Sequence, residues 1–325
     1  MSLQYTIDFN DWELPDGGAR PSTPANSDMR SAALREQLRG AGEIFDGTIY
    51  YISFGSGSSG NSCYIGTRRG GVIVDVGVRA ENIVEQLRRV GIGMDKVKGV
   101  LLTHDHTDHS KFVYTLLRAN KHLRLYCTNR VLNALLRRHN ISKRVKDYHV
   151  PIYKEFEFKI GEFVITPFDV PHDAADNAGF HLQAGDRHFV IATDIGAVTE
   201  RASHYMRLAN YLVIESNYDS EMLAHGPYPE YLKARIRTDH GHLDNADCAA
   251  FLADAVAPHL SHIFLCHLSK DNNTPEKALA AIRSALEAKG VSVGEGEETL
   301  RDVECDVQLT ALPRFDATRL YVLRH

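Results

Sequence analysis

The arrangement that most constrains this chain is a short apolar segment that ends directly in a histidine or a carboxylate, and it occurs four times. The four pairs are 163–170 with His172, 189–193 with Asp194, 211–214 with Glu215, and 262–266 with His267. Apolar runs rich in β-branched and aromatic residues predict buried strands. Helical periodicity, as over 80–90, separates the strand-like segments along the chain and indicates an α/β architecture. We therefore expect functional groups to gather at strand ends.

The densest group of metal-binding residue types follows the apolar run 97–103. Residues 104–109 read His-Asp-His-Thr-Asp-His, so imidazoles and carboxylates alternate over one short stretch. Neighbours at these spacings cannot share one face of a helix, but a loop that closes onto a helix start can direct them toward two adjacent metal ions. His104 and His106 would then serve one ion, and Asp108 and His109 the other. Imidazoles with a few carboxylates suit zinc, iron or manganese.

Composition and charge exclude several other classes of protein. Lys and Arg total 37 against 42 Asp and Glu, a net charge of -5, so whole-molecule electrostatics do not indicate a nucleic-acid or membrane binder, although a local basic patch stays open. No stretch approaches the roughly 18 apolar residues of a membrane-spanning helix, and the polar N-terminus does not resemble a secretory signal. Five cysteines without a C-x-x-C pair favour reduced thiols, so we expect a cytoplasmic protein with no membrane partner.

The chain divides into two parts of different character. Residues 15–24 are rich in proline and glycine, and 27–39 predict a short helix that ends at a glycine. We expect residues 1–45 to form an N-terminal extension. Residues 46–325 would form one domain, with a C-terminal extension after about residue 290.

The order of these residues resembles the signature of the metallo-β-lactamase superfamily, H-x-H-x-D-H followed by a distant His, Asp and His. The resemblance covers roughly residues 47–270 and implies an α/β fold, the αββα four-layer sandwich. It also implies the ligands of two metal ions, and Asp75 matches the family's early structural aspartate. The implied ligands are His104, His106 and His172 for one ion, Asp108, His109 and His267 for the other, and Asp194 as a bridge.

Five further segments are similar to the WalJ/YycJ branch of that superfamily, compact relatives of the RNase J and RNase Z nucleases that are described as DNA exonucleases. These segments are 54–61, 171–176, 215–219, 241–245 and 267–273. The 72 residues between Asp194 and His267 are too few for the large β-CASP cap domain of RNase J. The resemblance implies a dinuclear metal-dependent phosphodiesterase, a DNA or RNA exonuclease with two divalent ions, zinc or manganese, with iron accepted by the same ligands.

Two alternatives belong to other functional classes. The acidic net charge favours a metal-dependent hydrolase of a small ester, lactone, thioester, β-lactam or cyclic phosphodiester on the same fold. A non-catalytic metal-binding or nucleotide-binding module is the third class, and the complete ligand set opposes it. Salt dependence separates a polyanion ligand from a small ester, because only the polyanion releases counterions on binding.

The mechanism expected for the phosphodiesterase depends on the paired ions. Two ions about 3.5–4 Å apart lower the pKa of a shared water and stabilise both the attacking and the leaving oxygen. We expect a metal-bridging hydroxide, oriented by Asp108, to attack phosphorus. A general acid would help the leaving oxygen depart; His242 is the first candidate and His240 the second. For both, a surface or capping histidine is the alternative.

Several polar residues are candidates for contacts with substrate phosphates. In the glycine-serine loop 55–61, Ser58 and Asn61 belong either to an anion-binding nest of backbone N–H groups or to a tight strand connection. Ser269, Lys270 and Asn272 offer donors just past a ligand, or form a polar turn before a helix at Pro275.

Charged residues near the expected ligands suggest two further roles. The basic run 233–237 leads directly into 239–242, so it is a candidate for binding a phosphate backbone. Asp105, Asp173 and Glu215 are candidates for holding imidazoles in the correct tautomer.

Overall fold

The computed structural model describes residues 45–138, 141–295 and 305–324. The expected N-terminal extension lies outside the described residues apart from its last residue, and so does the short helix predicted within it. Among the described residues, none of the helices is both long and apolar enough to span a bilayer.

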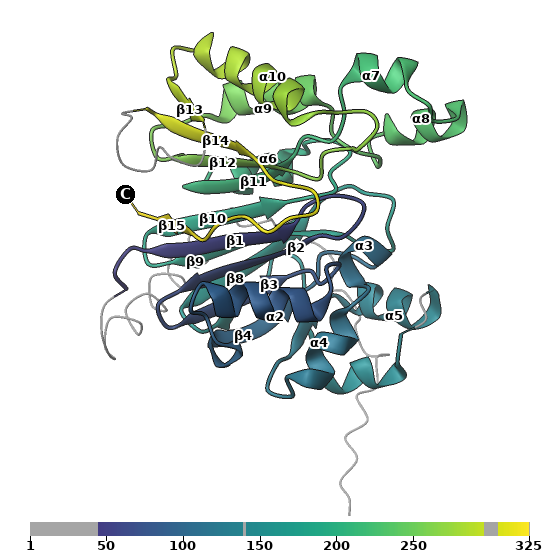
Figure 1. Ribbon diagram of the computed structural model, residues 1–325, viewed down its shortest axis with the longest axis vertical. Coiled ribbons are helices and arrows are strands. Elements are labelled where there is room, and N and C mark those ends of the chain that lie inside the picture. The colour runs from purple at the N-terminus through teal and green to yellow at the C-terminus, as the bar shows by residue number, and fades with distance from the viewer. Residues whose placement is uncertain (1–44, 139–140, 296–304, 325) are drawn as a thin grey trace, which may run out of the picture. The chain divides into compact units, whose positions relative to one another are not determined.

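Within the described residues, two mixed β-sheets form the centre of the domain (Figure 1). In sheet order, the first contains β15 (Tyr321–Leu323), β1 (Ile49–Gly55), β2 (Ser62–Thr67), β3 (Gly70–Val74), β4 (Val97–Leu101), β5 (Leu125–Cys127) and β6 (His149–Pro151). The second contains β13 (Val293–Glu295), β14 (Val307–Ala311), β12 (His262–Cys266), β11 (Tyr211–Glu215), β10 (Arg187–Ala192), β9 (Ala178–Ala184), β8 (Phe163–Asp169) and β7 (Phe158–Ile160).

The inner faces of the two sheets pack against each other and form a shared apolar core. Tyr51 of β1 lies among Phe189, Phe264 and Tyr321, with ring centroids 4.7 to 6.1 Å apart. These four side chains come from both sheets and are almost completely buried. Burial of such large apolar groups supplies the main favourable free energy for closing the sandwich.

Helices cover the outer face of each sheet and complete four layers (Figure 1). On the first sheet lie α2 (Ala80–Arg89), α4 (Val113–Ala119) and α5 (Asn129–Arg138), near the short helices η1 (Met94–Lys96) and η2 (Lys143–Tyr148). On the second sheet lie α6 (Glu200–Met206), α9 (Asn245–Ala255) and α10 (Pro275–Glu287). The predicted αββα sandwich is confirmed, and its helices present apolar stripes to the sheets as the sequence periodicity indicates.

The residues after position 290 contribute strands to both sheets. β13 and β14 pair with each other in parallel, and β14 also pairs with β12 in the second sheet. β15 then pairs antiparallel with β1 in the first sheet, with Tyr321 opposite Tyr51. This part of the chain therefore helps to build the sandwich, while the domain boundaries drawn from the sequence stay a prediction.

Strand direction places the ends of the functional strands at common edges. In the first sheet, β3 and β4 are parallel neighbours. In the second, β10, β11 and β12 run parallel to one another, and β8 shares their direction because β9 lies antiparallel between β8 and β10. The carboxyl ends of these strands are therefore grouped, and ligands bind at such ends in α/β sheets.

Candidate metal centre

The residues that follow the functional strands turn sharply out of the sheets. Asp75, Asp194 and His267 come directly after or close to the ends of β3, β10 and β12, and have φ angles of 59°, 53° and 55°. This left-handed conformation is costly for a residue with a side chain and persists only where the surroundings require it. His104 and His172 follow β4 and β8 within a few residues. The three left-handed turns therefore mark the sheet edges that carry the site.

The short helix α3 (Thr107–Ser110) presents Asp108 and His109 to the same region. It is held by the glycine-serine loop, since the backbone N–H of Asn61 donates to the carbonyl of Asp108 at 2.7 Å, and Gly77 N–H donates to the carbonyl of Asn61 at 2.9 Å. A Cβ atom at Gly77 would lie 1.5 Å from the Asp108 carbonyl oxygen. Glycine at position 77 is thus required for α3 to approach this closely.

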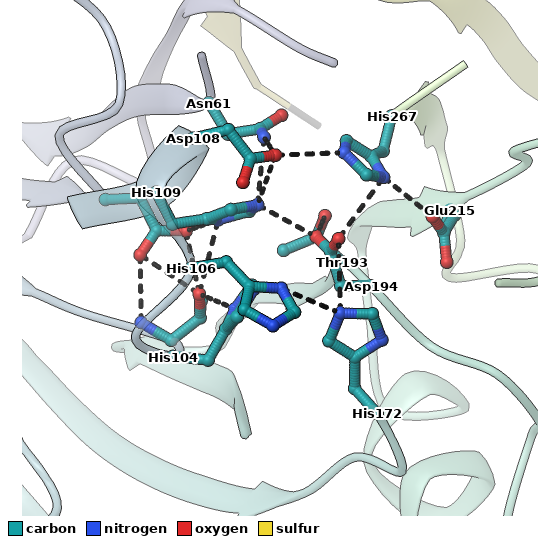
Figure 2. A network of polar contacts seen from close by, with 12 residues as sticks. Asn61, His104, His106, Asp108, His109, His172, Thr193, Asp194, Glu215 and His267 are labelled. Atoms are coloured by element: carbon teal, nitrogen blue, oxygen red, sulfur yellow. Dashed lines mark hydrogen bonds and ion pairs between the residues drawn. The ribbon is translucent and has the colours of Figure 1, made fainter. Parts of the chain in front are cut away.

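The structure brings the expected ligands together in two groups beside one carboxylate (Figure 2). The ligand atoms within each group lie within 4.8 Å of one another; the groups are His104, His106 and His172, and Asp108, His109 and His267. The Oδ2 atom of Asp194 lies 3.1 Å from His109 Nε2. Its Oδ1 atom lies 3.3 Å from His267 Nδ1 and 3.8 Å from His172 Nε2. Asp194 therefore stands between the groups, where the resemblance places the bridging ligand.

The donor atoms fit divalent metal ions. His104 is fully buried and its Nδ1 lies 2.9 Å from the Thr103 hydroxyl, yet its Nε2 has no hydrogen-bond partner among the described residues. The Nε2 of His267 is equally buried without a hydrogen bond in that part of the chain, 3.5 Å from Asp108 Oδ2. Buried polar atoms without partners are rare and costly. Imidazole nitrogens and carboxylates in this arrangement match the ligands that zinc and manganese accept.

Comparison with known proteins agrees with this geometry. A family model described as a beta-lactamase superfamily domain matches residues 72–266, more than half of the chain. The chain belongs to the metallo-β-lactamase superfamily. Its fold resembles that of the metallo-β-lactamase fold protein YhfI from Bacillus subtilis, with a TM-score of 0.59 at 13% identity, over 83% of this chain and 99% of that one.

Two sequence relatives lie in the predicted branch of this superfamily. The chain is 34% identical over 256 residues to exodeoxyribonuclease YycJ of Bacillus anthracis, covering 77% of this chain and 94% of the relative. It is 32% identical over 245 residues to exodeoxyribonuclease WalJ of Streptococcus pneumoniae, covering 75% and 90%. The predicted resemblance to the WalJ/YycJ branch is confirmed.

Two imidazoles of this metallo-β-lactamase site, those of His109 and His172, each have the Nδ1 atom held by a neighbouring residue. The Nδ1 atom of His109 lies 2.7 Å from Asp75 Oδ2, while the Thr103 backbone N–H donates to the other oxygen of Asp75 at 2.9 Å. The Nδ1 of His172 lies 3.0 Å from the carbonyl oxygen of Gly241. Such partners set the tautomer and direct the second nitrogen to the metal. Asp75 therefore links the His109 ring to the backbone of Thr103.

Glu215 anchors two histidines at once and is completely buried. Its Oε1 lies 2.8 Å from Nδ1 of His267 and 2.8 Å from Nδ1 of His242, and Oε2 accepts the Ile195 backbone N–H at 2.8 Å. Burial alone would raise the pKa of Glu215, but the facing imidazoles hold it below its usual value. Of the three carboxylates predicted to orient imidazoles, Glu215 has the clearest contacts.

The other two predicted carboxylates differ in position. Asp173 Oδ1 lies 3.5 Å from His172 Nε2, and its Oδ2 pairs with Arg235. Asp105 is buried, but its Oδ1 accepts the Ala175 backbone N–H at 3.1 Å and its Oδ2 lies 3.6 Å from Arg138. Asp105 thus ties together the chain segments around the site.

Electrostatics in the cluster favour the charged form of Asp194. Burial opposes a charged Asp194, but the imidazoles of His267 and His109 hold its pKa well below the usual range. Burial likewise disfavours a charged His267, yet Asp194, Asp108 and Glu215 raise the pKa of His267 to about 10. A metal ion that binds His267 would therefore have to displace a proton from its imidazole.

The two candidates for general acid occupy different positions. His242 lines a cavity beside the metal ligands, and its side chain is 23% exposed. Burial disfavours its charged form, but the Glu215 carboxylate outweighs burial and raises the pKa of His242. His240 is exposed and does not line the cavity. Geometry therefore favours the first candidate over the second.

The candidates for phosphate contact also separate by position. Ser58 and Ser269 line the same cavity, and Lys270 is exposed next to it in sequence. Asn61 and Asn272 are buried: the Asn61 side chain bonds to Gly57 and lies 3.2 Å from Asp108, and the Asn272 side chain lies within its own loop. The Asn61 amide nitrogen also lies 2.9 Å from His109 Nε2, so Asn61 faces the expected ligands, and the phosphate contacts of both asparagines stay a prediction.

The basic run 233–237 is not a continuous cationic surface. The Lys233 side chain is buried, and its Nζ donates to the carbonyl of Ala224 at 2.8 Å. Arg235 lines the cavity while paired with Asp173. Lys233 is therefore not available to bind a phosphate backbone, because its position on the helix directs its side chain into the protein.

Sequence reasoning missed two groups that shape the site. Thr103 contacts both His104 and Asp75, and Asn217 donates to the carbonyl of His267 at 2.7 Å. The position of Thr103 directly before the expected ligand His104 could have indicated from the sequence that its hydroxyl contacts the site. The Asn217 contact joins positions 50 residues apart, and the sequence carries no local sign of it.

Proposed function

We propose that this chain is a metal-dependent exonuclease that hydrolyses phosphodiester bonds at the end of a DNA strand. The observation that carries the proposal is the convergence of all seven expected ligands beside a cavity that also contains His242. The similarity to two exodeoxyribonucleases over about three quarters of the chain supports DNA as the substrate.

We assign two divalent ions, zinc or manganese, to the two donor groups. His104, His106 and His172 would hold one ion, and Asp194 would be shared with the second group. The ions supply Lewis acidity when bound, activating water and stabilising negative charge on the phosphate. The chain's own contribution is to fix the donor atoms through Asp75, Glu215 and the Gly241 carbonyl.

Two residues of the chain have further roles in this proposal. Asp108 is 22% exposed and points toward the ligand cluster, so its carboxylate orients the attacking water. His242 has Nδ1 fixed on Glu215, which leaves Nε2 as the nitrogen available to substrate. His242 therefore donates a proton to the leaving oxygen, and Ser58, Ser269 and Lys270 contact phosphate oxygens.

We place this activity in the cytoplasm. All five cysteines are free, and four of them are buried. Burial raises the pKa of the Cys63 and Cys248 thiols, so both are inert. A chain with free thiols and no disulfide among its described residues suits a reducing compartment.

The test is cleavage of 5′-phosphorylated single-stranded and duplex oligonucleotides by protein loaded with manganese or zinc. The expected result is stepwise release of mononucleotides that ceases in Asp108→Asn and persists in His240→Gln. A parallel assay with bis(4-nitrophenyl) phosphate reports whether the metal centre is active. Hydrolysis of that small ester without any oligonucleotide cleavage would contradict the nuclease and favour the small-molecule hydrolase.

A further inference from the structure

A cavity of about 190 Å³ opens beside the metal ligands. His242 and His267 form one side of it, so the cavity is continuous with the proposed reaction site. Further lining residues come from α8 (Glu230–Ile236) and from the segment that joins it to α7 (Ser220–His225). A molecule held in this cavity would lie next to the metal centre.

The wall contributed by this segment is apolar and aromatic. Tyr228, Leu232 and Ile236 line the cavity, together with Leu268 from the loop after β12. The first three pack on a small cluster of their own with Leu223. The Tyr228 hydroxyl donates to Asp271 Oδ2 at 3.1 Å. The aromatic ring is therefore held at both ends, one by packing and one by a hydrogen bond.

The polar groups that line the cavity are of three kinds. Asp173 and Arg235 form an ion pair with each other. His242 and His267 are the imidazoles of the proposed reaction site, and Ser58, Asn217 and Ser269 are uncharged hydrogen-bonding groups. A cavity with an aromatic and aliphatic wall beside several hydrogen-bonding groups suits a flat ring with polar edges.

We propose that this cavity is the subsite for the terminal nucleobase of the DNA strand, with Tyr228 as its stacking surface and Leu232 and Ile236 as its apolar wall. The proposal rests on the proposed nuclease function. The base is the apolar, planar part of a nucleotide. A base held here places the phosphodiester of the same nucleotide within reach of His242 and the metal ligands. Stacking tolerates every base, as a nuclease that degrades successive nucleotides requires.

The test uses two single-stranded oligonucleotides of the same sequence, one intact and one with a tetrahydrofuran abasic residue at both ends. Release of the first residue is measured with the metal-loaded full chain. We expect kcat/KM to be about tenfold lower for the abasic substrate, the order of magnitude of a lost base–aromatic stack. Tyr228→Ala should lower kcat/KM on the intact substrate by a similar factor, mainly through KM, and leave the abasic substrate unaffected.

Three variants complete the design. Tyr231 lies on α8, three positions after Tyr228, and is 77% exposed and outside the cavity lining, so Tyr231→Ala should change the rate on neither substrate. Tyr228→Phe keeps the ring and loses the bond to Asp271, so it should keep the preference for the intact end. Leu232→Ala removes a different part of the apolar wall and should reduce the preference for the intact oligonucleotide over the abasic one. This variant provides the test if Tyr228→Ala does not fold.

The outcomes separate this proposal from the nuclease itself. Equal rates of wild-type protein on the two oligonucleotides would overturn the base subsite and leave the exonuclease standing. A loss of equal size on both substrates in Tyr228→Ala would show a structural role for the ring and also overturn it. No cleavage of either oligonucleotide by the metal-loaded wild type would overturn the proposed function and the subsite together.

Discussion

Two regions of this molecule surround a buried histidine with different neighbours. In the metal centre, His267 is surrounded by Asp108, Asp194 and Glu215. In the middle of β9, His181 is also buried, but its Nε2 lies 2.8 Å from Nδ1 of another histidine, His188, with the rings stacked 5.1 Å apart. Burial is common to both regions, and the nearby carboxylates distinguish them.

The consequence is a difference in protonation. Carboxylates overcome burial and raise the pKa of His267 to about 10. Burial, reinforced by His188 and His204, lowers the pKa of His181 to about 3. The sign of the pKa shift at these two buried imidazoles thus follows their neighbours, carboxylates at His267 and other imidazoles at His181. The metal centre contains both kinds of imidazole, because burial and the neighbouring His109 also hold the pKa of His104 well below its usual value.

The largest effect is expected from removing the carboxylate shared by both donor groups. Asp194→Asn preserves size and tolerates the left-handed backbone at this position, but removes the charge that faces His109 and His267. Enzymatic accelerations are typically about 10⁶-fold or more, and in the proposed mechanism they depend on both ions. DNA cleavage should therefore fall by about 10⁴-fold or more, together with bound metal measured by mass spectrometry.

The matched control is Asp186→Asn, since Asp186 is 78% exposed in the turn between β9 and β10. It should retain full activity and metal content. An Asp194→Asn protein that binds two ions and cleaves at the wild-type rate would show that Asp194 is not a ligand.

The next largest effect separates two histidines only two positions apart. His242→Gln removes the proposed proton donor and should lower kcat by about 100- to 1000-fold, within the range for general acid catalysis, while His240→Gln should leave it unchanged. The loss in His242→Gln should shrink on a substrate with a 4-nitrophenolate leaving group, which departs without a proton. An equal loss on both kinds of substrate would exclude the acid role.

The sequence predicted the strand-end part of this site well, for a physical reason. His172, Asp194 and His267 each follow a strand whose residues are mostly apolar, β8, β10 and β12 respectively, and strands of that kind are buried inside an α/β sheet. Because these strands are parallel, their carboxyl ends lie at the same edge of the sheet, and the residues that follow them come close together there. The placement of the ligands thus follows from local patterns together with one rule of sheet topology.

Other features depend on contacts between distant parts of the chain. The carbonyl that fixes His172 belongs to Gly241, 69 positions away, and carbonyl groups have no sequence signature. β15 has three residues and pairs with β1 from the opposite end of the domain. The inward turn of Lys233 depends on a carbonyl of α7. None of these contacts leaves a periodic pattern of residues in the sequence, so none could be predicted from the sequence alone.

A smaller loss is expected when an imidazole is left in place and only its anchor is changed. Asp75→Asn keeps the residue size and the left-handed backbone, but removes the carboxylate that holds His109 Nδ1. Loss of such a partner lowers metal affinity by roughly 10- to 100-fold. Competition with a chelator measures that affinity, and saturating metal should restore most of the activity. Failure of excess metal to restore cleavage would mean that Asp75 acts in another way.

The smallest effect concerns stability and tests the second group of histidines. His181 has a pKa of about 3 in the folded chain and about 6.5 when unfolded. Between these values the unfolded chain binds more protons, so the folded state is fully favoured above the unfolded pKa and loses stability as pH falls toward the folded one. From neutral pH to pH 5 this group should cost about 2 kcal/mol.

Replacing His181 with glutamine removes the titrating group and keeps a polar atom near the position of Nε2. The free energy of unfolding, measured with urea at pH 7.5 and pH 5 with metal present, should fall by about 2 kcal/mol less in His181→Gln than in wild type. His225→Gln is the control, because His225 lies on the surface of α7 with its side chain 79% exposed, and it should retain the wild-type pH dependence. If His181→Gln and wild type lose the same stability on acidification, His181 is charged in the folded chain at pH 5. The contrast with His267 would then be wrong, because both buried histidines would carry a proton.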